Sequence, residues 1–167
     1  WFRQKHTTFN NRNGYGLYIA SKSYTNLDKL NFLRYNNGIY YTSSSNNNTI
    51  TSATCNSNGS YGIYYGSGSS NNTITSATCN SNNNSGIYYG SSNNNTITSA
   101  TCNSNTYGIY YGSSSNNNTI TSATCNSNSQ NGIYYSSGCN NNTIYALSTT
   151  GNTTAGIYSD NANNICH

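Results

Sequence analysis

The side chains that most often carry out catalytic chemistry are scarce in this sequence of 167 residues. Two carboxylic acids, Asp28 and Asp160, occur together with two histidines, His6 and His167. Hydrolysis of a glycosidic bond typically needs two carboxyl groups that flank the bond. The two acids lie about five copies of the repeat described below apart, which is roughly 25 Å at the spacing of β-strands, and both histidines are terminal. The residues predict no catalytic group, and we expect the chain not to be an enzyme.

Cysteine is the second residue type that could take part in chemistry. No Cys-x-x-Cys pair and no histidine cluster accompanies it, so we expect no metal site and no cofactor. Four cysteines recur once per repeat and fit a ladder of small buried side chains or disulfides between coils, which would need a backbone shift. The better disulfide candidates, within or between subunits, are Cys139 and Cys166. The four recurring residues are Cys55, Cys79, Cys102 and Cys125.

A tyrosine recurs at one position of every repeat, beside a position that is apolar in the divergent first copy. We expect its side chain to lie outside. It would either stack along neighbouring strands or form an aromatic strip for a sugar or a neighbouring subunit. The set, called the tyrosine row below, comprises Tyr18, Tyr40, Tyr64, Tyr88, Tyr110, Tyr134 and Tyr158.

Threonine pairs separated by one residue recur in four repeats. Both members of such a pair point to the same face of a strand, which predicts a flat double row with spacings of about 4.8 Å and about 6.7 Å. This arrangement resembles the ice-binding faces of insect antifreeze proteins. The candidate ice face comprises Thr49, Thr51, Thr73, Thr75, Thr96, Thr98, Thr119 and Thr121.

Asn-x-Ser/Thr sequons, which accept N-linked glycans in secreted proteins, are also repeated. Most of them are copies of one turn. In a host that glycosylates its secreted proteins, they would decorate the surface heavily. The candidate acceptors are Asn47, Asn58, Asn71, Asn83, Asn94, Asn117, Asn141 and Asn152.

One repeat positions all of these residues and fills nearly the whole chain. The element Gly-Ile-Tyr-Tyr, with a variant at each end, recurs in steps of 22 or 24 residues. Between most copies runs the block Thr-Ile-Thr-Ser-Ala-Thr-Cys-Asn-Ser-Asn. Short alternating runs of β-branched and aromatic residues, broken by Gly, Asn and Ser, are typical of strands rather than helices. A period of this length therefore predicts a β-solenoid.

Period-two alternation assigns each residue of a strand to a face. Ile39 and Tyr41 point one way and Tyr40 points the other. The first copy has Leu and Ile at the former pair, so these positions face the core. The same comparison places Ile50 and Cys55 inside. The Asn-Asn-Asn turns are expected to stack as amide ladders.

Composition and charge narrow the possible partners. Charged residues make up 5% of the chain and the net charge is +4. All lysines and arginines lie in the first 34 residues, so the repeat body has no basic patch for a nucleic acid. No apolar stretch is long enough to span a membrane. We expect residues 1–13 to form a basic and aromatic capping or contact segment, and residues 14–167 to form one β-helix domain.

The pattern Gly-Ile-Tyr-Tyr followed by Asn-Asn-Thr-Ile-Thr resembles the right-handed parallel β-helix repeats of the NosD-like and pectin-lyase-like superfamily over residues 14–166. The resemblance implies an all-β fold, a right-handed parallel β-helix (β-solenoid) with about six coils of 22–24 residues and three short strands per coil. That superfamily includes polysaccharide lyases and hydrolases, surface adhesins and phage tailspikes. The copper role associated with the NosD name does not carry over, because its ligands are missing here.

The last residues suggest a further, open coil, with Ile165 at the position of Ile50. Our leading hypothesis is a non-catalytic extracellular or cell-surface structural protein that stacks end to end into a filament or forms part of a surface adhesin. The alternatives are an ice-binding protein that uses the threonine rows and a carbohydrate-binding module that uses the tyrosine row. The expected partners are further copies of the chain, a polysaccharide or ice.

Overall fold

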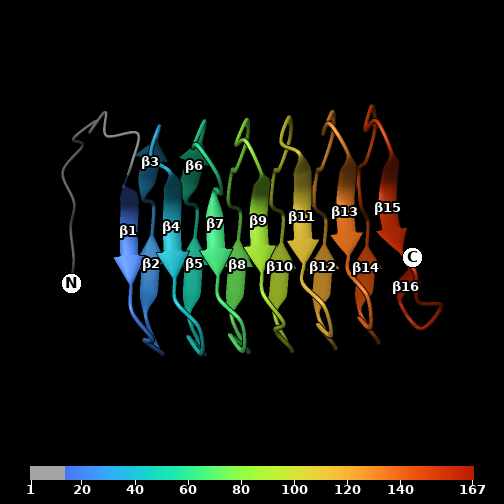
Figure 1. Ribbon diagram of the computed structural model, residues 1–167, viewed down its shortest axis with the longest axis horizontal. Coiled ribbons are helices and arrows are strands. Elements are labelled where there is room, and N and C mark those ends of the chain that lie inside the picture. Colours follow the sequence, from blue (N-terminus) through green and yellow to red (C-terminus); the bar gives the residue numbers. More distant parts are fainter. Residues whose placement is uncertain (1–13) are drawn as a thin grey trace.

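Strands of two to five residues, interrupted by polar turns, wind into a parallel β-helix in the computed structural model, which describes residues 14–167. The predicted capping segment, residues 1–13, lies outside the described residues. Successive coils stack side by side along the long axis, and the two large sheets lie on opposite sides of the rod (Figure 1). No helix in the described part of the chain is long and apolar enough to cross a membrane.

Sheet A is formed by the first strand of every coil, and all of its neighbours pair in parallel. Its strands follow the Gly-Ile-Tyr-Tyr element. In spatial order they are β1 (Tyr15–Ile19), β4 (Asn37–Tyr41), β7 (Ile63–Tyr65), β9 (Ser85–Tyr89), β11 (Tyr107–Tyr111), β13 (Asn131–Tyr135) and β15 (Ala155–Ser159).

Sheet B is formed by the Thr-Ile-Thr segments and also has seven parallel strands, where the sequence predicted about six coils. The strands are β2 (Asn26–Asp28), β5 (Thr49–Thr51), β8 (Thr73–Thr75), β10 (Thr96–Thr98), β12 (Thr119–Thr121), β14 (Thr143–Tyr145) and β16 (Ile165–Cys166). The third side has one short sheet, β3 (Asn31–Leu33) with β6 (Thr54–Asn56), continued by single bridges from Thr54 to Ser148.

The core is built from ladders of identical side chains, as the alternation predicted. Ile39, Tyr41, Ile50, Ala53 and Cys55 are buried, and so are their counterparts in the next coils. Glycine precedes the isoleucine of sheet A because the chain passes too close for a side chain. A Cβ atom on Gly62 would lie 2.5 Å from the carbonyl oxygen of Gly86.

Two columns of asparagine tie the turns together. The Asn48 side chain donates its amide to the Oδ1 atom of Asn72 at 3.1 Å, and the same bond links each coil to the next as far as Asn164. A second column starts at Asn58, whose amide donates to Asn82. Buried polar groups are stable only when they are hydrogen-bonded. These ladders therefore confirm the predicted amide stacking and hold the register of the solenoid.

The last coil corrects one prediction of register. Ile165 pairs with Thr143 and Cys166 pairs with Ile144, so Cys166, and not Ile165, is in register with the Ile50 column, and both residues are exposed in this last coil. Asn164 explains the difference, because its Oδ1 atom accepts the amide of Asn142 at 2.9 Å and so occupies the ladder position that precedes the sheet B strands from β5 onward.

Candidate functional site

The tyrosine row runs along the outer face of sheet A as one in-register column. Each of its members is the parallel partner of the next, from Tyr18 to Tyr158. Neighbouring ring centroids are 4.4–5.7 Å apart, with angles of 1–29° between the ring planes. Face-to-face contact would need only about 3.5–4 Å, so the rings are offset, and the residues of the row are half-buried in the middle of the rod and exposed at its two ends.

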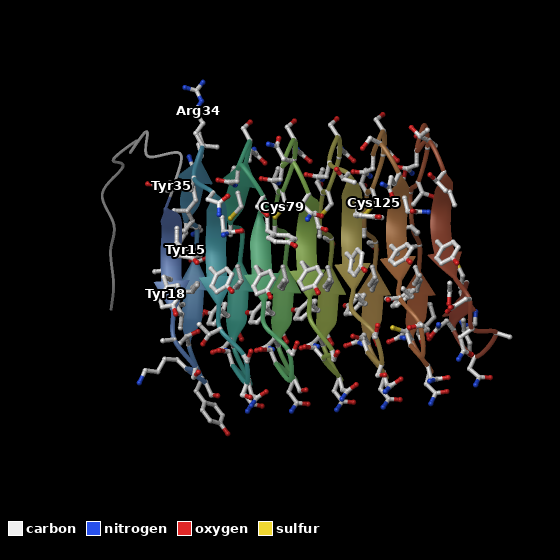
Figure 2. The ribbon with its side chains drawn as sticks, viewed as in Figure 1. Tyr15, Tyr18, Arg34, Tyr35, Cys79 and Cys125 are labelled. Atoms are coloured by element: carbon white, nitrogen blue, oxygen red, sulfur yellow. The ribbon has the colours of Figure 1, made fainter. Side chains whose placement is uncertain are left out.

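Three further tyrosines widen this row into a surface, which we call the tyrosine face. Tyr15, Tyr61 and Tyr107 stand in front of the glycine of their coils, and the sequence analysis did not single them out. Tyr61 packs against Tyr64 and Tyr88 with tilted rings at 5.1 and 5.2 Å, and Tyr15 and Tyr107 make equivalent contacts. The aromatic rings follow one another along the middle of the rod (Figure 2).

An ordinary tyrosine phenol has a pKa near 10 and is therefore neutral at physiological pH, and at several positions of the tyrosine face the pKa is raised further. Partial burial and the neighbouring Tyr64 hydroxyl raise the pKa of Tyr40 to about 12. Burial and the nearby phenols likewise raise the pKa of Tyr64 and of Tyr88. A neutral phenol both donates and accepts a hydrogen bond. The face therefore presents apolar rings and hydroxyl groups without charge.

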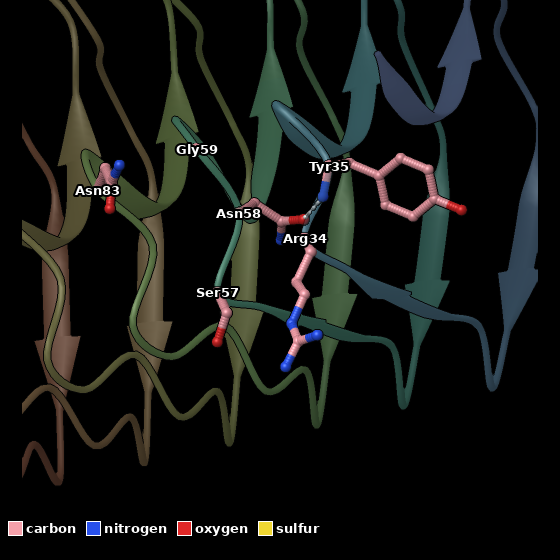
Figure 3. A pocket seen from close by; sticks show the side chains of 6 residues that line it. All are labelled: Arg34, Tyr35, Ser57, Asn58, Gly59 and Asn83. Carbon is pink, nitrogen blue, oxygen red and sulfur yellow. Dashed lines mark hydrogen bonds between the residues drawn. The ribbon is translucent and has the colours of Figure 1, made fainter. Parts of the chain in front are cut away.

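A notch with one arginine lies at the turns that precede strands β4, β7 and β9 of sheet A. Its volume is about 450 Å³ and it is lined by Arg34, Tyr35, Ser57, Asn58, Gly59 and Asn83. Gly59 follows the ladder residue Asn58, whereas the next coil has Asn83 at the equivalent position, so a missing side chain opens the notch. Figure 3 shows the guanidinium of Arg34 beside Ser57, with the ring of Tyr35 turned away and the backbone N–H of Tyr35 bonded to Asn58.

The threonine rows form the outer face of sheet B in the register that the sequence predicted. Thr49, Thr73, Thr96 and Thr119 are successive parallel partners, and the second row pairs in the same way. All of these side chains are half-buried. At the two ends the pattern stops, because Thr51 pairs with Asp28 and Thr121 pairs with Tyr145.

The structure divides the eight sequons into different environments. Asn47, Asn71, Asn94, Asn117 and Asn141 are exposed and have positive φ values of 55–58°. Asn83 is exposed as well. By contrast, Asn58 is 1% exposed and its amide is bonded within the ladder, and Asn152 accepts the amide of Asn128.

The four recurring cysteines point into the core, as the alternation indicated, and all six cysteines are free thiols in the structure. The hydrogen bond with Cys102 and burial raise the pKa of the Cys125 thiol well above its usual value. Cys139 is also buried and donates to the carbonyl oxygen of Gly112 at 3.2 Å, while Cys166 is exposed. The predicted disulfide role of Cys139 and Cys166 stays a prediction.

The carboxylates occupy separate surroundings. Asp28 ends a strand of sheet B, and its Oδ2 atom lies 3.8 Å from the Nζ atom of Lys29, with both side chains largely exposed. Asp160 lies just after β15 at the other end of the rod and is exposed. His167 stacks on Tyr145 at 4.9 Å. Among the described residues, no three His, Cys, Asp or Glu side chains lie close enough to hold a metal ion together.

Comparison with known families and structures agrees with this architecture. A family model described as a right-handed β-helix region matches residues 15–166. The chain therefore belongs to the right-handed β-helix family, as the resemblance of its repeats implied. A search among curated proteins gave no match.

Solved structures with the same fold carry the names of polysaccharide-modifying enzymes. The A-module of a mannuronan C-5 epimerase from Azotobacter vinelandii superposes with a TM-score of 0.82 at 14% identity, over 92% of this chain and 48% of that one. A variant of the periplasmic alginate epimerase AlgG gives a TM-score of 0.81 at 15% identity, over 96% of this chain and 43% of that one. The chain thus spans less than half the length of these two structures, and the likeness at this identity is one of fold.

These neighbours correct the expectation that the chain is not an enzyme. They are epimerases by name, so the fold that this chain shares with them is one that supports catalysis. The expectation relied on the scarcity of carboxylates and on a comparison with glycosidases. Glycosidase chemistry is one of several that act on polysaccharides, and counting acids for that chemistry does not exclude the others.

Proposed function

We propose that the chain is an extracellular β-solenoid that binds an acidic polysaccharide along its tyrosine face. The observation that carries the proposal is the in-register tyrosine row, which offers a nearly identical group once per coil. A polysaccharide also repeats the same unit along its length. Matching two repeating surfaces adds many weak contacts into one useful affinity.

The chemistry of the face suits sugars. The offset rings expose apolar surface on which the C–H face of a pyranose ring can pack, and tyrosine adds a hydroxyl that donates to or accepts from sugar hydroxyls. Tyrosine phenols are uncharged at neutral pH because their ordinary pKa is near 10, and burial raises the pKa of Tyr40, Tyr64 and Tyr88 further. An anionic polymer therefore meets no repulsion there.

The charges of the described chain favour an acidic polymer over a neutral one. Arg34 lines the notch together with Gly59, which stands two residues before Tyr61 in the next coil. A guanidinium binds carboxylates with paired hydrogen bonds. Lys22 and Lys29 are exposed in the same coil. The names of the structural neighbours, which refer to alginate and mannuronan, support the same class of ligand.

Affinity electrophoresis in gels that contain alginate, with gels of neutral dextran as the reference, tests the proposal. We expect retardation by alginate. Combining Tyr64→Ala, Tyr88→Ala and Tyr110→Ala should weaken it about tenfold or more, which corresponds to about 1.4 kcal/mol. The matched control combines Thr75→Ala, Thr98→Ala and Thr121→Ala on sheet B.

The proposal fails if the unaltered protein is not retarded, or if the tyrosine and threonine variants lose equal affinity. Circular dichroism of both variants checks that the solenoid is intact. A one-dimensional proton spectrum of the polymer after incubation tests whether binding is accompanied by chemical conversion of the sugar.

The notch is tested separately. Arg34→Gln should lower the affinity for alginate and flatten its dependence on salt, since screening acts only on the charged contact. Gly59→Asn fills the notch with the side chain that the next coil has naturally, and space exists for it because a Cβ on Gly59 would meet its nearest neighbour at 3.4 Å. Equal affinity in all three proteins would remove the notch from the binding site.

Ice binding by sheet B is the second candidate, favoured by the in-register double row of threonines. Thermal hysteresis of the purified protein measures it directly. Thr98→Tyr should abolish the effect because it breaks the flat row, and the natural Tyr145 in the Thr121 column indicates that sheet B accommodates this side chain. Tyr88→Ala on sheet A is the control that should leave hysteresis unchanged.

The structural hypotheses are compatible with polysaccharide binding. A surface-attached solenoid that holds a polysaccharide acts as an adhesin, and localisation by immunoelectron microscopy on whole cells tests that placement. Stacking of the solenoid end to end into a filament also stays a prediction. Negative-stain electron microscopy of native material tests it, because filaments must have an axial repeat that is a multiple of about 4.8 Å.

A further inference from the structure

Five turns between sheets A and B have the sequence Asn-Asn-Asn, or Ser-Asn-Asn at residues 70–72, and the side chains at their three positions have different roles. The last asparagine of each turn, such as Asn95, is buried and bonded in the ladder. The first, such as Asn93 or Asn116, accepts a backbone N–H from the next coil. The middle one is exposed, and its side chain takes part in no hydrogen bond within the described residues. These middle residues are Asn47, Asn71, Asn94, Asn117 and Asn141.

All five middle residues share one backbone conformation. Their φ values are 55–58°, in the left-handed region that asparagine tolerates better than most residues. Each one stands at the same turn of its coil, so the five form a single file along one edge of the rod. Polar side chains project from these turns along the lower edge in Figure 2.

Each of the five is also the acceptor residue of a sequon. The ladder asparagine follows it, and the first threonine of a sheet B strand completes the motif, as in Asn94-Asn95-Thr96. The two sequons outside the file that involve ladder residues are different. Modification of Asn58 or Asn152 would place a sugar on an amide nitrogen that already donates a hydrogen bond, to Asn82 and to the carbonyl oxygen of Cys125 respectively.

We propose that this file is an N-glycosylation comb, which takes an oligosaccharide from a lipid-linked pyrophosphate donor. The Nδ2 atom of asparagine forms a bond to the anomeric carbon of the first sugar. The bond from that carbon to the phosphate oxygen breaks, and the lipid pyrophosphate leaves with the electron pair. The proton lost from Nδ2 passes to a base of the transferase.

The spacing of the five asparagines limits how many of them carry a glycan at the same time. Neighbouring acceptors are one coil apart, which is about 4.8 Å, and a pyranose ring with its equatorial hydroxyl groups is wider than that. Glycans on adjacent coils therefore collide, whereas glycans on alternate coils fit. Alternate occupancy, of which Asn47, Asn94 and Asn141 form one set, follows. The edge that carries the comb is separate from the tyrosine face, so the inference does not depend on polysaccharide binding.

Secretion of the full chain from a host with an active oligosaccharyltransferase tests this inference, with a known acceptor protein produced in parallel. Intact-mass analysis and glycopeptide mapping are the readouts. We expect glycans on residues of the file, rarely on adjacent coils, and none on Asn58 or Asn152 in folded material. Absence of glycan from the file while the parallel protein is modified overturns the proposal, and so does occupancy of Asn58 equal to that of the file.

One variant tests the crowding directly. Asn94→Gly removes the central acceptor and keeps the backbone, since glycine adopts positive φ without strain. Occupancy of Asn71 and Asn117 should then rise at least twofold. Thermal unfolding of the variant after enzymatic removal of glycans serves as the control for folding. Unchanged occupancy at both neighbours in a folded variant shows that the sites are independent and contradicts the crowding.

Discussion

Two columns of tyrosine run side by side through this molecule, and they differ only in which face of sheet A they occupy. The outer column contains Tyr64 and Tyr88, and the inner column contains Tyr65 and Tyr89. Both stack with nearly parallel rings, at 5.0 Å outside and 4.8 Å inside for these pairs. The inner rings are 0% exposed, so one residue type serves as core and as surface within a single dipeptide.

The hydroxyl groups show what this difference costs. Outside, the phenols reach solvent. Inside, the hydroxyls of Tyr65, Tyr89, Tyr111 and Tyr135 are buried without a hydrogen-bond partner, whereas Tyr41 bonds to Thr25. Burial therefore raises the pKa of Tyr65 and Tyr89 well above the usual value. The inner column gains apolar contact from the rings and loses free energy at the unbonded hydroxyls.

Alkaline pH should have the largest effect on the inner column, because it lowers the free energy of unfolding. A buried phenol with a raised pKa stabilises the fold fully below pH 10, where it is neutral in both states. Above pH 10 only the unfolded chain releases the proton, so the free energy of unfolding falls by about 1.4 kcal/mol per pH unit for each tyrosine. The five inner tyrosines together reach up to about 7 kcal/mol per unit.

Circular dichroism during a pH titration should therefore show constant structure near neutrality and cooperative unfolding above pH 10. Replacing Tyr65, Tyr89 and Tyr111 with Phe removes three of the titrating groups and should make the decline shallower. A protein whose stability stays level up to pH 12 would refute the assignment of these phenols to the core.

Truncating one ring of each column gives the next largest difference. Tyr89→Ala leaves a cavity in the core and should lower the free energy of unfolding by about 3–5 kcal/mol. Tyr88→Ala removes only partly exposed contacts and should cost about 1 kcal/mol. Chemical denaturation of both variants measures the gap. Equal losses would mean that the inner and outer rings contribute equally to the free energy of unfolding.

The sequence predicted this division of faces because strand alternation is strict and the divergent first copy has Leu17 and Ile19 at the inner positions. It predicted the amide ladders for a similar reason, since identical turns stack in register. It did not identify Tyr61 and Tyr107 as part of the outer surface, because they stand at a position that is Asn, Ser or Ala in other coils.

Other features depend on three-dimensional contacts that a single repeat does not encode. The notch arises because Gly59 has no side chain at the position where the neighbouring coil has Asn83. It becomes visible only when neighbouring coils are compared. The position of Ile165 was wrong because the prediction aligned apolar residues, whereas the ladder residue Asn164 determines the register. Aligning the asparagines of the turns would have placed Cys166 correctly.

Removing single hydroxyl groups should separate the members of the inner column by their effect on stability. Tyr89→Phe deletes an unbonded hydroxyl and should leave stability unchanged or raise it by about 1 kcal/mol. Tyr41→Phe deletes a hydroxyl that bonds to Thr25 and should lower stability by about 0.5–1.5 kcal/mol. Thermal denaturation of the two variants compares them. A loss on Tyr89→Phe as large as that on Tyr41→Phe would imply a partner for the Tyr89 hydroxyl, such as an ordered water molecule.

The same change in the outer column should have the smallest effect on folding and a separate effect on binding. Tyr88→Phe keeps the stacked ring and loses a solvent-facing hydroxyl, so stability should change by less than about 0.5 kcal/mol. If the tyrosine face binds a polysaccharide, the lost hydroxyl removes one hydrogen bond to sugar, and alginate affinity should fall by a factor of about two to ten. Titration calorimetry at fixed salt measures this change. Unaltered affinity in Tyr88→Phe, together with lost affinity in Tyr88→Ala, would assign the binding to the rings alone, because the ring is the only group that the two variants do not share.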